Sequence, residues 1–139
     1  MAEKIKVSQD SRFKTEISAA DPEGDADSMH RVKRLHELTP YGMLLASLGS
    51  CTTIVLHTYA RAHDVSLDRA SVSVEYRRSF KEDCENCEGR DKYVDAIHES
   101  LELEGDLTDE QRRKLEHVAG LCSIRKILKR GIDVKSDDA

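Results

Sequence analysis

The chain has 139 residues, of which 35% are charged and 4% aromatic, with no tryptophan. This length suits a single domain spanning residues 1–139, with one core that must be mostly aliphatic. The 38% hydrophobic share is modest for a lone monomer and favours a homodimer that shares its core. A formal net charge of -5 argues against a nucleic-acid partner, because a phosphate-binding face normally needs a clustered basic excess.

Residues 1–6 lack the apolar segment of a secretory signal peptide. No apolar run approaches the ~20 residues that a membrane span requires. We therefore expect a soluble, cytoplasmic protein with no membrane partner. In that compartment the cysteines indicate redox chemistry, catalysis or metal binding sooner than a disulfide scaffold.

The N-terminal part reads as three short strands. Residues 4–7, 13–19 and 28–35 contain the apolar positions, and turn-like segments lie at 8–11 and 21–25. We expect these strands to form an antiparallel meander.

A long helix follows the meander. Thr39 suits its N-cap and Pro40 its first helical position, where a missing N–H does no harm. The segment up to about His63 is apolar nearly all round, which is typical of a buried helix. We expect it to be the central helix of the fold.

The C-terminal half predicts two strands and two short helices. Residues 72–80 and 93–103 alternate apolar and polar side chains, as in strands with one buried face. Thr108 and Gln111 form a capping box at the start of one helix, and a second helix follows Cys122 and ends at Gly131. Residues 132–135 suit a last strand. The pattern is that of an α+β domain.

Cys51 lies near the middle of the long helix. A packed core thiol is one interpretation, since free cysteine is often buried. The other is a functional thiol, because Gly49 costs helix stability by ~1 kcal/mol and polar Ser50, Thr52 and Thr53 interrupt an apolar run. Such a small, polar surround would let a substrate approach and would hydrogen-bond a thiolate.

Cys122 precedes the last helix, so it lies at a helix N-terminus. The helix dipole and free N–H groups there favour a thiolate and lower its pKa. The alternative is a buried cysteine on the apolar stripe with Leu115 and Val118. His57, six residues after Cys51, points elsewhere on an ideal helix, which disfavours a Cys–His hydrolase.

Cys84 and Cys87 have the spacing of a metal knuckle or a redox pair. One such pair supplies two of zinc's usual four ligands, so two copies facing each other across a dimer would complete a zinc site. A loop disulfide and a reduced pair are the alternatives. Nearby acids raise thiol pKa values and oppose redox reactivity, whereas a zinc site tolerates them.

Two cysteine motifs resemble those of the OsmC/Ohr family (osmotically inducible protein C and organic hydroperoxide resistance protein). The segment 39–52 resembles the family's Pro-x-x-Leu-Leu-x-Ala-x-x-x-Cys motif on the central helix, which ends here at Cys51. The segment 121–128 resembles the Cys-Pro-Val-x-x-x-Leu motif, with Ser123 in place of the Pro after Cys122. Residues 76–108 resemble one OsmC-like branch. The resemblance covers about residues 39–135.

The resemblance implies an α+β fold in which antiparallel sheets pack around a long buried central helix, as an intertwined homodimer. It implies that Cys51 reduces an organic hydroperoxide and that Cys122 resolves the resulting sulfenic acid into a disulfide. A dithiol reductant then resets the pair. No metal or organic cofactor is required at this site.

The family's Arg and Glu beside the thiolate match less directly. Arg31 is the best candidate for the Arg, with Arg34 behind it. Tyr41 occupies the Glu position, and Glu37 is the nearest substitute. A non-catalytic or redox-sensing dimer that binds a small ligand, and a metal-stabilised dimer using the Cys84 and Cys87 pair, remain the alternative functions.

Overall fold

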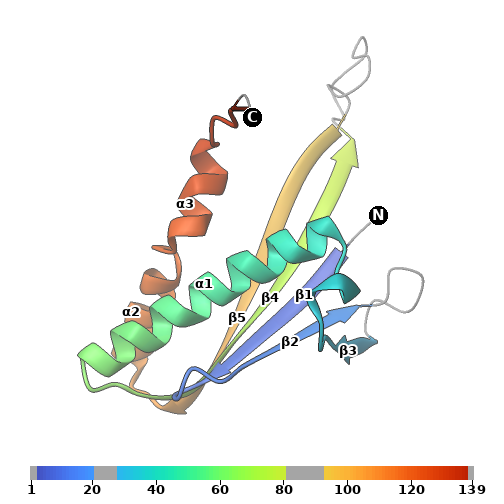
Figure 1. Ribbon diagram of the computed structural model, residues 1–139. Coiled ribbons are helices and arrows are strands. Elements are labelled where there is room, and N and C mark those ends of the chain that lie inside the picture. Colours follow the sequence, from blue (N-terminus) through green and yellow to red (C-terminus); the bar gives the residue numbers. More distant parts are fainter. Residues whose placement is uncertain (1–2, 21–27, 81–92, 138–139) are drawn as a thin grey trace.

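One antiparallel sheet carries a long helix on one face (Figure 1). The computed structural model describes residues 3–20, 28–80 and 93–137. The five strands lie in the order β3-β2-β1-β4-β5. The elements are, in chain order, β1 (Glu3–Asp10), β2 (Thr15–Ala20), β3 (Met29–Arg31), η1 (Leu35–Glu37), α1 (Pro40–Ala62), β4 (Ser66–Phe80), β5 (Tyr93–Asp106), α2 (Asp109–Ala119) and α3 (Ser123–Arg130).

The predicted N-terminal meander and C-terminal strand pair are both present, with different bounds. β1 joins them, because it pairs with β2 on one side and with β4 on the other. The third strand is shorter than predicted and ends at Arg31. The chain then turns into η1, since the Glu37 carboxylate accepts hydrogen bonds from the N–H groups of Lys33 and Arg34.

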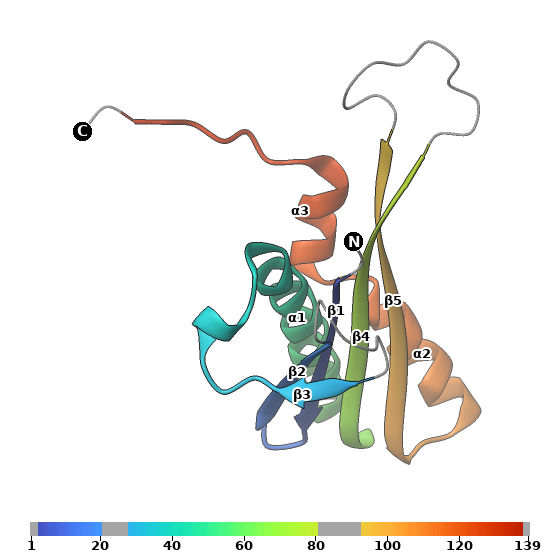
Figure 2. The ribbon, with the colours of Figure 1, turned by 90° about the vertical axis from the view of Figure 1, so that its right-hand side faces the viewer.

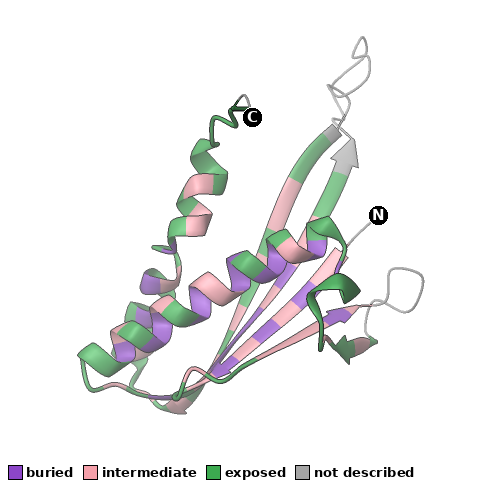
Figure 3. Cartoon of the chain, in the orientation of Figure 1, coloured by how far each residue is buried: buried purple, intermediate pink, exposed green. Residues whose placement is uncertain are grey.

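Helix α1 begins where the sequence predicts. The Thr39 hydroxyl accepts a hydrogen bond from the N–H of Gly42 at 3.0 Å, and Pro40 opens the helix. Its inner face packs on β1 and β4. Its outer face is exposed and apolar, including Leu44 and Ile54, so the prediction of a helix buried all round is wrong for the single chain (Figure 3).

The expectation of no apolar run near membrane-spanning length is also wrong. The 23 residues of α1 are long and apolar enough to cross a bilayer, by length and composition alone. However, half of its most apolar 18-residue stretch is buried inside the domain, as is typical of a helix that packs on a core.

Gly49 serves close packing rather than access to Cys51, which corrects the sequence interpretation. A Cβ at this position would lie 2.8 Å from Cγ2 of Val7, on the sheet side of α1. The buried Thr52 and Thr53 hydroxyls donate to helix carbonyls, those of Leu48 and Ser50, at 3.0 Å each. These small residues therefore let α1 approach the sheet and do not surround the thiol.

The core forms two clusters under α1. One lies between the first half of α1 and strands β1 and β4, and it includes Cys122. The other joins the second half of α1 to α2 through Leu56, Leu115 and Val118. The predicted capping box starts α2: the Thr108 hydroxyl accepts from the Gln111 N–H, and the Gln111 side chain accepts from the Thr108 N–H.

Residues 132–135 are not a strand in the single chain, contrary to prediction. Gly131 ends α3 with a φ of 83°, and the chain then leads away from the domain (Figure 2). Ile132 and Val134 are 64% and 87% exposed. The segment has no strand to pair with, because α3 has carried it away from the sheet.

Candidate active site

The two cysteines predicted to react come together in space. Cys51 lies on α1, on the side that faces the start of α3, and its thiol is half-buried. Its sulfur lies 3.7 Å from the hydroxyl oxygen of Ser123. Cys122, the N-cap of α3, is within hydrogen-bonding reach of the same sulfur.

The pKa of Cys51 is below that of an ordinary thiol. Burial alone raises it, but hydrogen bonds to the sulfur outweigh burial. The donors are the Cys122 thiol, the backbone N–H of Ile124, and the hydroxyl and N–H of Ser123. These groups form the first turn of α3, where free N–H groups and the helix dipole favour an anion. Cys51 is therefore the more acidic thiol of the pair.

Cys122 has the opposite shift, which corrects the sequence prediction. Its side chain is 0% exposed, and burial raises its pKa. The neighbouring Cys51 raises it further, and this outweighs the N–H groups of Arg125 and Ile124. The helix N-terminus stabilises a thiolate as predicted, but at Cys51, which approaches it from another element. Two thiols in contact, one with a lowered pKa and one with a raised pKa, are suited to nucleophile and resolving roles.

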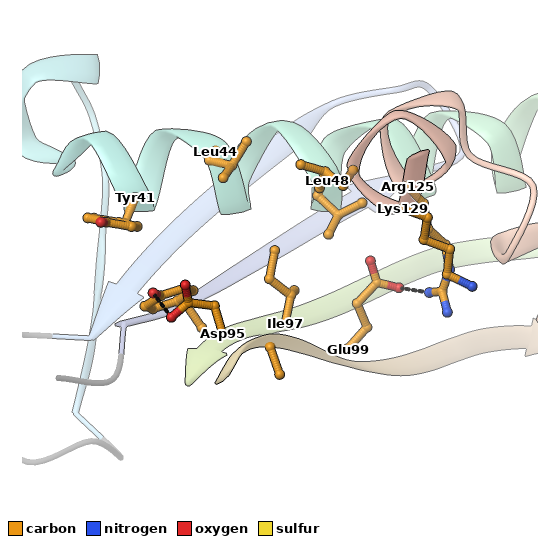
Figure 4. Close-up of a pocket in the computed structure, with 11 residues that line it drawn as sticks. Tyr41, Leu44, Leu48, Asp95, Ile97, Glu99, Arg125 and Lys129 are labelled. Atoms are coloured by element: carbon orange, nitrogen blue, oxygen red, sulfur yellow. Dashed lines mark hydrogen bonds and ion pairs between the residues drawn. The ribbon is translucent and has the colours of Figure 1, made fainter. Parts of the chain in front are cut away.

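An apolar groove of about 460 Å³ lies between α1, β5 and α3 (Figure 4). Tyr41, Leu44 and Leu48 line its α1 side, and Ile97 lines it from β5. These α1 residues are spaced by three and four positions, so they form one stripe of the helix. Cys51 is the next residue on that stripe, and the groove therefore runs toward the reactive sulfur.

A charged pair closes the end of the groove, and the sequence interpretation missed it. Arg125 Nη1 donates to Glu99 Oε2 at 2.8 Å, joining α3 to β5 (Figure 4). A signal was present, because Glu99 falls between Ile97 and Leu101 on the inward face of a strand pattern. A charged side chain at an apolar position of this kind indicates a specific partner.

The groups expected to support the thiolate lie elsewhere in the single chain. Arg31 Nη2 lies 3.6 Å from Glu16 Oε1 on the neighbouring strand, and both side chains are exposed. Glu37 caps η1 as described above. The Tyr41 ring lies 5.0 Å from that of Tyr76, between ring centroids. A role for Arg31 at Cys51 stays a prediction.

His57 is separate from the thiols, as its spacing predicts. It is buried, and its Nε2 lies 2.7 Å from the carbonyl oxygen of Gln9. Cys84 and Cys87 lie outside the described residues, so zinc binding there stays a prediction. Within residues 3–20, 28–80 and 93–137, no three His, Cys, Asp or Glu side chains are grouped to hold a metal.

Comparison with known proteins gives one family. A sequence model described as OsmC-like protein matches residues 33–137. No curated protein sequence matches the chain. The structure of an OsmC-like hydroperoxide resistance protein from Jannaschia sp. CCS1 aligns with a TM-score of 0.59 and 12% identity, over 99% of this chain and 96% of that chain. The organic hydroperoxide resistance protein OhrB of Bacillus subtilis aligns with a TM-score of 0.46 and 16% identity, over 96% and 94%.

Proposed function

The chain belongs to the OsmC-like protein family, and from this premise we propose that it reduces organic hydroperoxides through Cys51 and Cys122. Membership of the family supports a hydroperoxide-related function in stress defence. The observation that carries the finer proposal is the thiol pair itself. The Cys51 sulfur receives hydrogen bonds from the first turn of α3 and from the Cys122 thiol.

The first step uses the acidic thiol. The Cys51 thiolate attacks the terminal oxygen of a hydroperoxide, ROOH, and the O–O bond breaks. Cys51 becomes a sulfenic acid, and the departing alkoxide takes a proton to leave as an alcohol. The lowered pKa of Cys51 supports this role, because the thiolate and not the thiol is the nucleophile.

The second step uses Cys122, the thiol with the raised pKa. The Cys122 sulfur attacks the sulfenic sulfur, water leaves, and a disulfide joins the two residues. A dithiol reductant then exchanges with the disulfide and restores both thiols. The hydrogen bond between the two thiols supports this step, because a disulfide forms only between cysteines that lie side by side. The scheme requires no metal or organic cofactor at the pair.

The groove supports an organic rather than an inorganic peroxide. Its walls are mainly aliphatic and aromatic carbon from α1 and β5. An alkyl or aryl group there buries apolar surface, which stabilises binding by roughly 25 cal/mol per Å². Hydrogen peroxide has no such group and gains nothing from the groove.

The proposal includes a cytoplasmic homodimer. The outer face of α1 exposes Tyr41, Leu44 and Ile54, which are 49%, 40% and 47% accessible in the single chain. Tyr41 and Leu44 also line the groove, so a second copy packed against α1 would close the open side of the groove and would supply the second layer around the helix that the resemblance implies. Sedimentation velocity measures whether the protein is a monomer or a dimer in solution.

The decisive experiment is peroxide titration of the fully reduced protein. We expect cumene hydroperoxide to form a Cys51–Cys122 disulfide much faster than hydrogen peroxide does, as mapped by mass spectrometry. Cys51→Ser should be inert, and Cys122→Ser should accumulate a sulfenic acid at Cys51. A Cys84→Ser, Cys87→Ser double variant is the matched control and should turn over normally.

Other outcomes would redirect the proposal. Slow oxidation without preference between cysteines would favour a ligand-binding or redox-sensing dimer. A bond confined to Cys84 and Cys87, or zinc that co-purifies and is lost from their Ser variants, would favour a metal-stabilised dimer.

A further inference from the structure

Helix α3 presents the groups that stabilise the Cys51 thiolate, yet few contacts attach this helix to the rest of the domain. None of its residues is fully buried. In the described part of the chain we find two polar side-chain contacts between α3 and other elements. They are Ser123 to Cys51 at 3.7 Å and Arg125 to Glu99 at 2.8 Å. The first is part of the site itself, so the second is its polar anchor to the sheet.

The contact between Arg125 and Glu99 holds the first turn of α3, the turn whose N–H groups face the Cys51 sulfur. The N–H groups of Ser123 and Ile124 bind the Cys51 sulfur, and Arg125 is the next residue of the same turn. A tie between Arg125 and β5 therefore fixes the height and direction of these N–H groups over α1. We propose that Glu99 and Arg125 are positioning residues, which hold the first turn of α3 against the Cys51 sulfur and so set its reactivity.

Stability alone does not account for this pair. The Glu99 side chain is 15% exposed, and its Oε1 is buried without a hydrogen-bond partner. Burial raises the pKa of Glu99, and Arg125 opposes the rise. A half-satisfied buried carboxylate contributes little to folding, and an apolar residue between Ile97 and Leu101 would pack better. A function at the neighbouring thiol explains why a carboxylate is placed there.

The inference rests on the proposed function only in taking Cys51 as the reactive thiol. Its test therefore uses alkylation, which needs no peroxide turnover. The rate of Cys51 modification by iodoacetamide is followed against pH in the reduced full-length protein, by quantitative peptide mapping. Absent peroxide turnover with the expected alkylation shift would reject the peroxidase proposal and keep the positioning role.

Glu99→Gln separates positioning from simple charge balance. If Glu99 positions α3, its loss lets the N–H groups retreat and raises the apparent pKa of Cys51. We expect a rise of about one unit, which is about a tenfold loss of alkylation rate below the pKa. If Glu99 only neutralises Arg125, the unpaired guanidinium would instead lower the pKa of Cys51. A lowered or unchanged pKa overturns the proposal.

Three further variants complete the test. Arg125→Met should raise the pKa of Cys51 like Glu99→Gln, and the double variant should add nothing, because both remove one contact. Glu99→Leu suits the apolar neighbours and replaces Glu99→Gln if that variant does not fold, as judged by circular dichroism. Glu75→Gln breaks an ion pair of 2.9 Å with Arg77 on the same sheet and should leave Cys51 unchanged.

Discussion

Replacing Gly49 with alanine tests how closely α1 must approach the sheet to place Cys51. Gly49 is buried in the middle of α1, two residues before Cys51. An added Cβ would lie 2.8 Å from Cγ2 and 3.2 Å from Cβ of Val7, and 3.4 Å from Cγ2 of Val74. Val7 is 0% exposed and β-branched, so it has little freedom to move aside.

Two opposing effects decide how much Gly49→Ala changes the free energy of unfolding. Alanine gains about 1 kcal/mol of helix propensity over glycine. Overpacking a filled core costs about 1–3 kcal/mol. We therefore expect Gly49→Ala to lower the free energy of unfolding by roughly 0–2 kcal/mol. Gly42→Ala is the matched control, because its Cβ would meet Thr39 Oγ1 at 3.4 Å, an ordinary contact. It should be neutral or stabilising.

Urea denaturation at one fixed protein concentration measures the free energy of unfolding of each variant. We expect that of Gly49→Ala to be roughly 1–3 kcal/mol lower than that of Gly42→Ala. Val7→Ala makes room for the new methyl group. Combined with Gly49→Ala, it should cost less than the sum of the single changes by about 0.5–3 kcal/mol. Equal stabilisation by both glycine replacements would refute the close-packing argument.

Two further predictions follow from the pKa directions. Iodoacetamide should label Cys51 well before Cys122 in the native protein, because the pKa of Cys51 is lowered while Cys122 is buried with a raised pKa; equal labelling rates in peptide maps would contradict this assignment. For His57, burial lowers the pKa despite the hydrogen bond to Gln9, so the neutral ring contributes stability that is present above its unfolded pKa of about 6.5 and is lost as pH falls through the lower folded pKa. The loss of unfolding free energy between about pH 7.5 and 5.5 should therefore shrink in His57→Gln but not in His63→Gln, a change at an exposed histidine; an unchanged loss in His57→Gln would show that other groups carry the pH dependence.

The sequence by itself determined where the helices begin and where the last helix ends. Thr39 and Pro40 begin α1, Thr108 and Gln111 cap α2, and Gly131 ends α3, as predicted. Each of these signals depends on groups within a few residues of one another, so local chemistry is sufficient to set them. The same is true of the period-2 pattern that predicts β4 and β5.

Only the tertiary structure decided which thiol becomes acidic. The N–H groups in the first turn of α3 hydrogen-bond to the sulfur of Cys51, which comes from a distant part of the chain. Cys122 stands beside the same turn but is buried, so its pKa rises. Likewise, the inward position of Glu99 was visible in the strand pattern, whereas its partner Arg125 was not. Contacts across elements depend on packing distances and burial, and these are properties of the assembled fold.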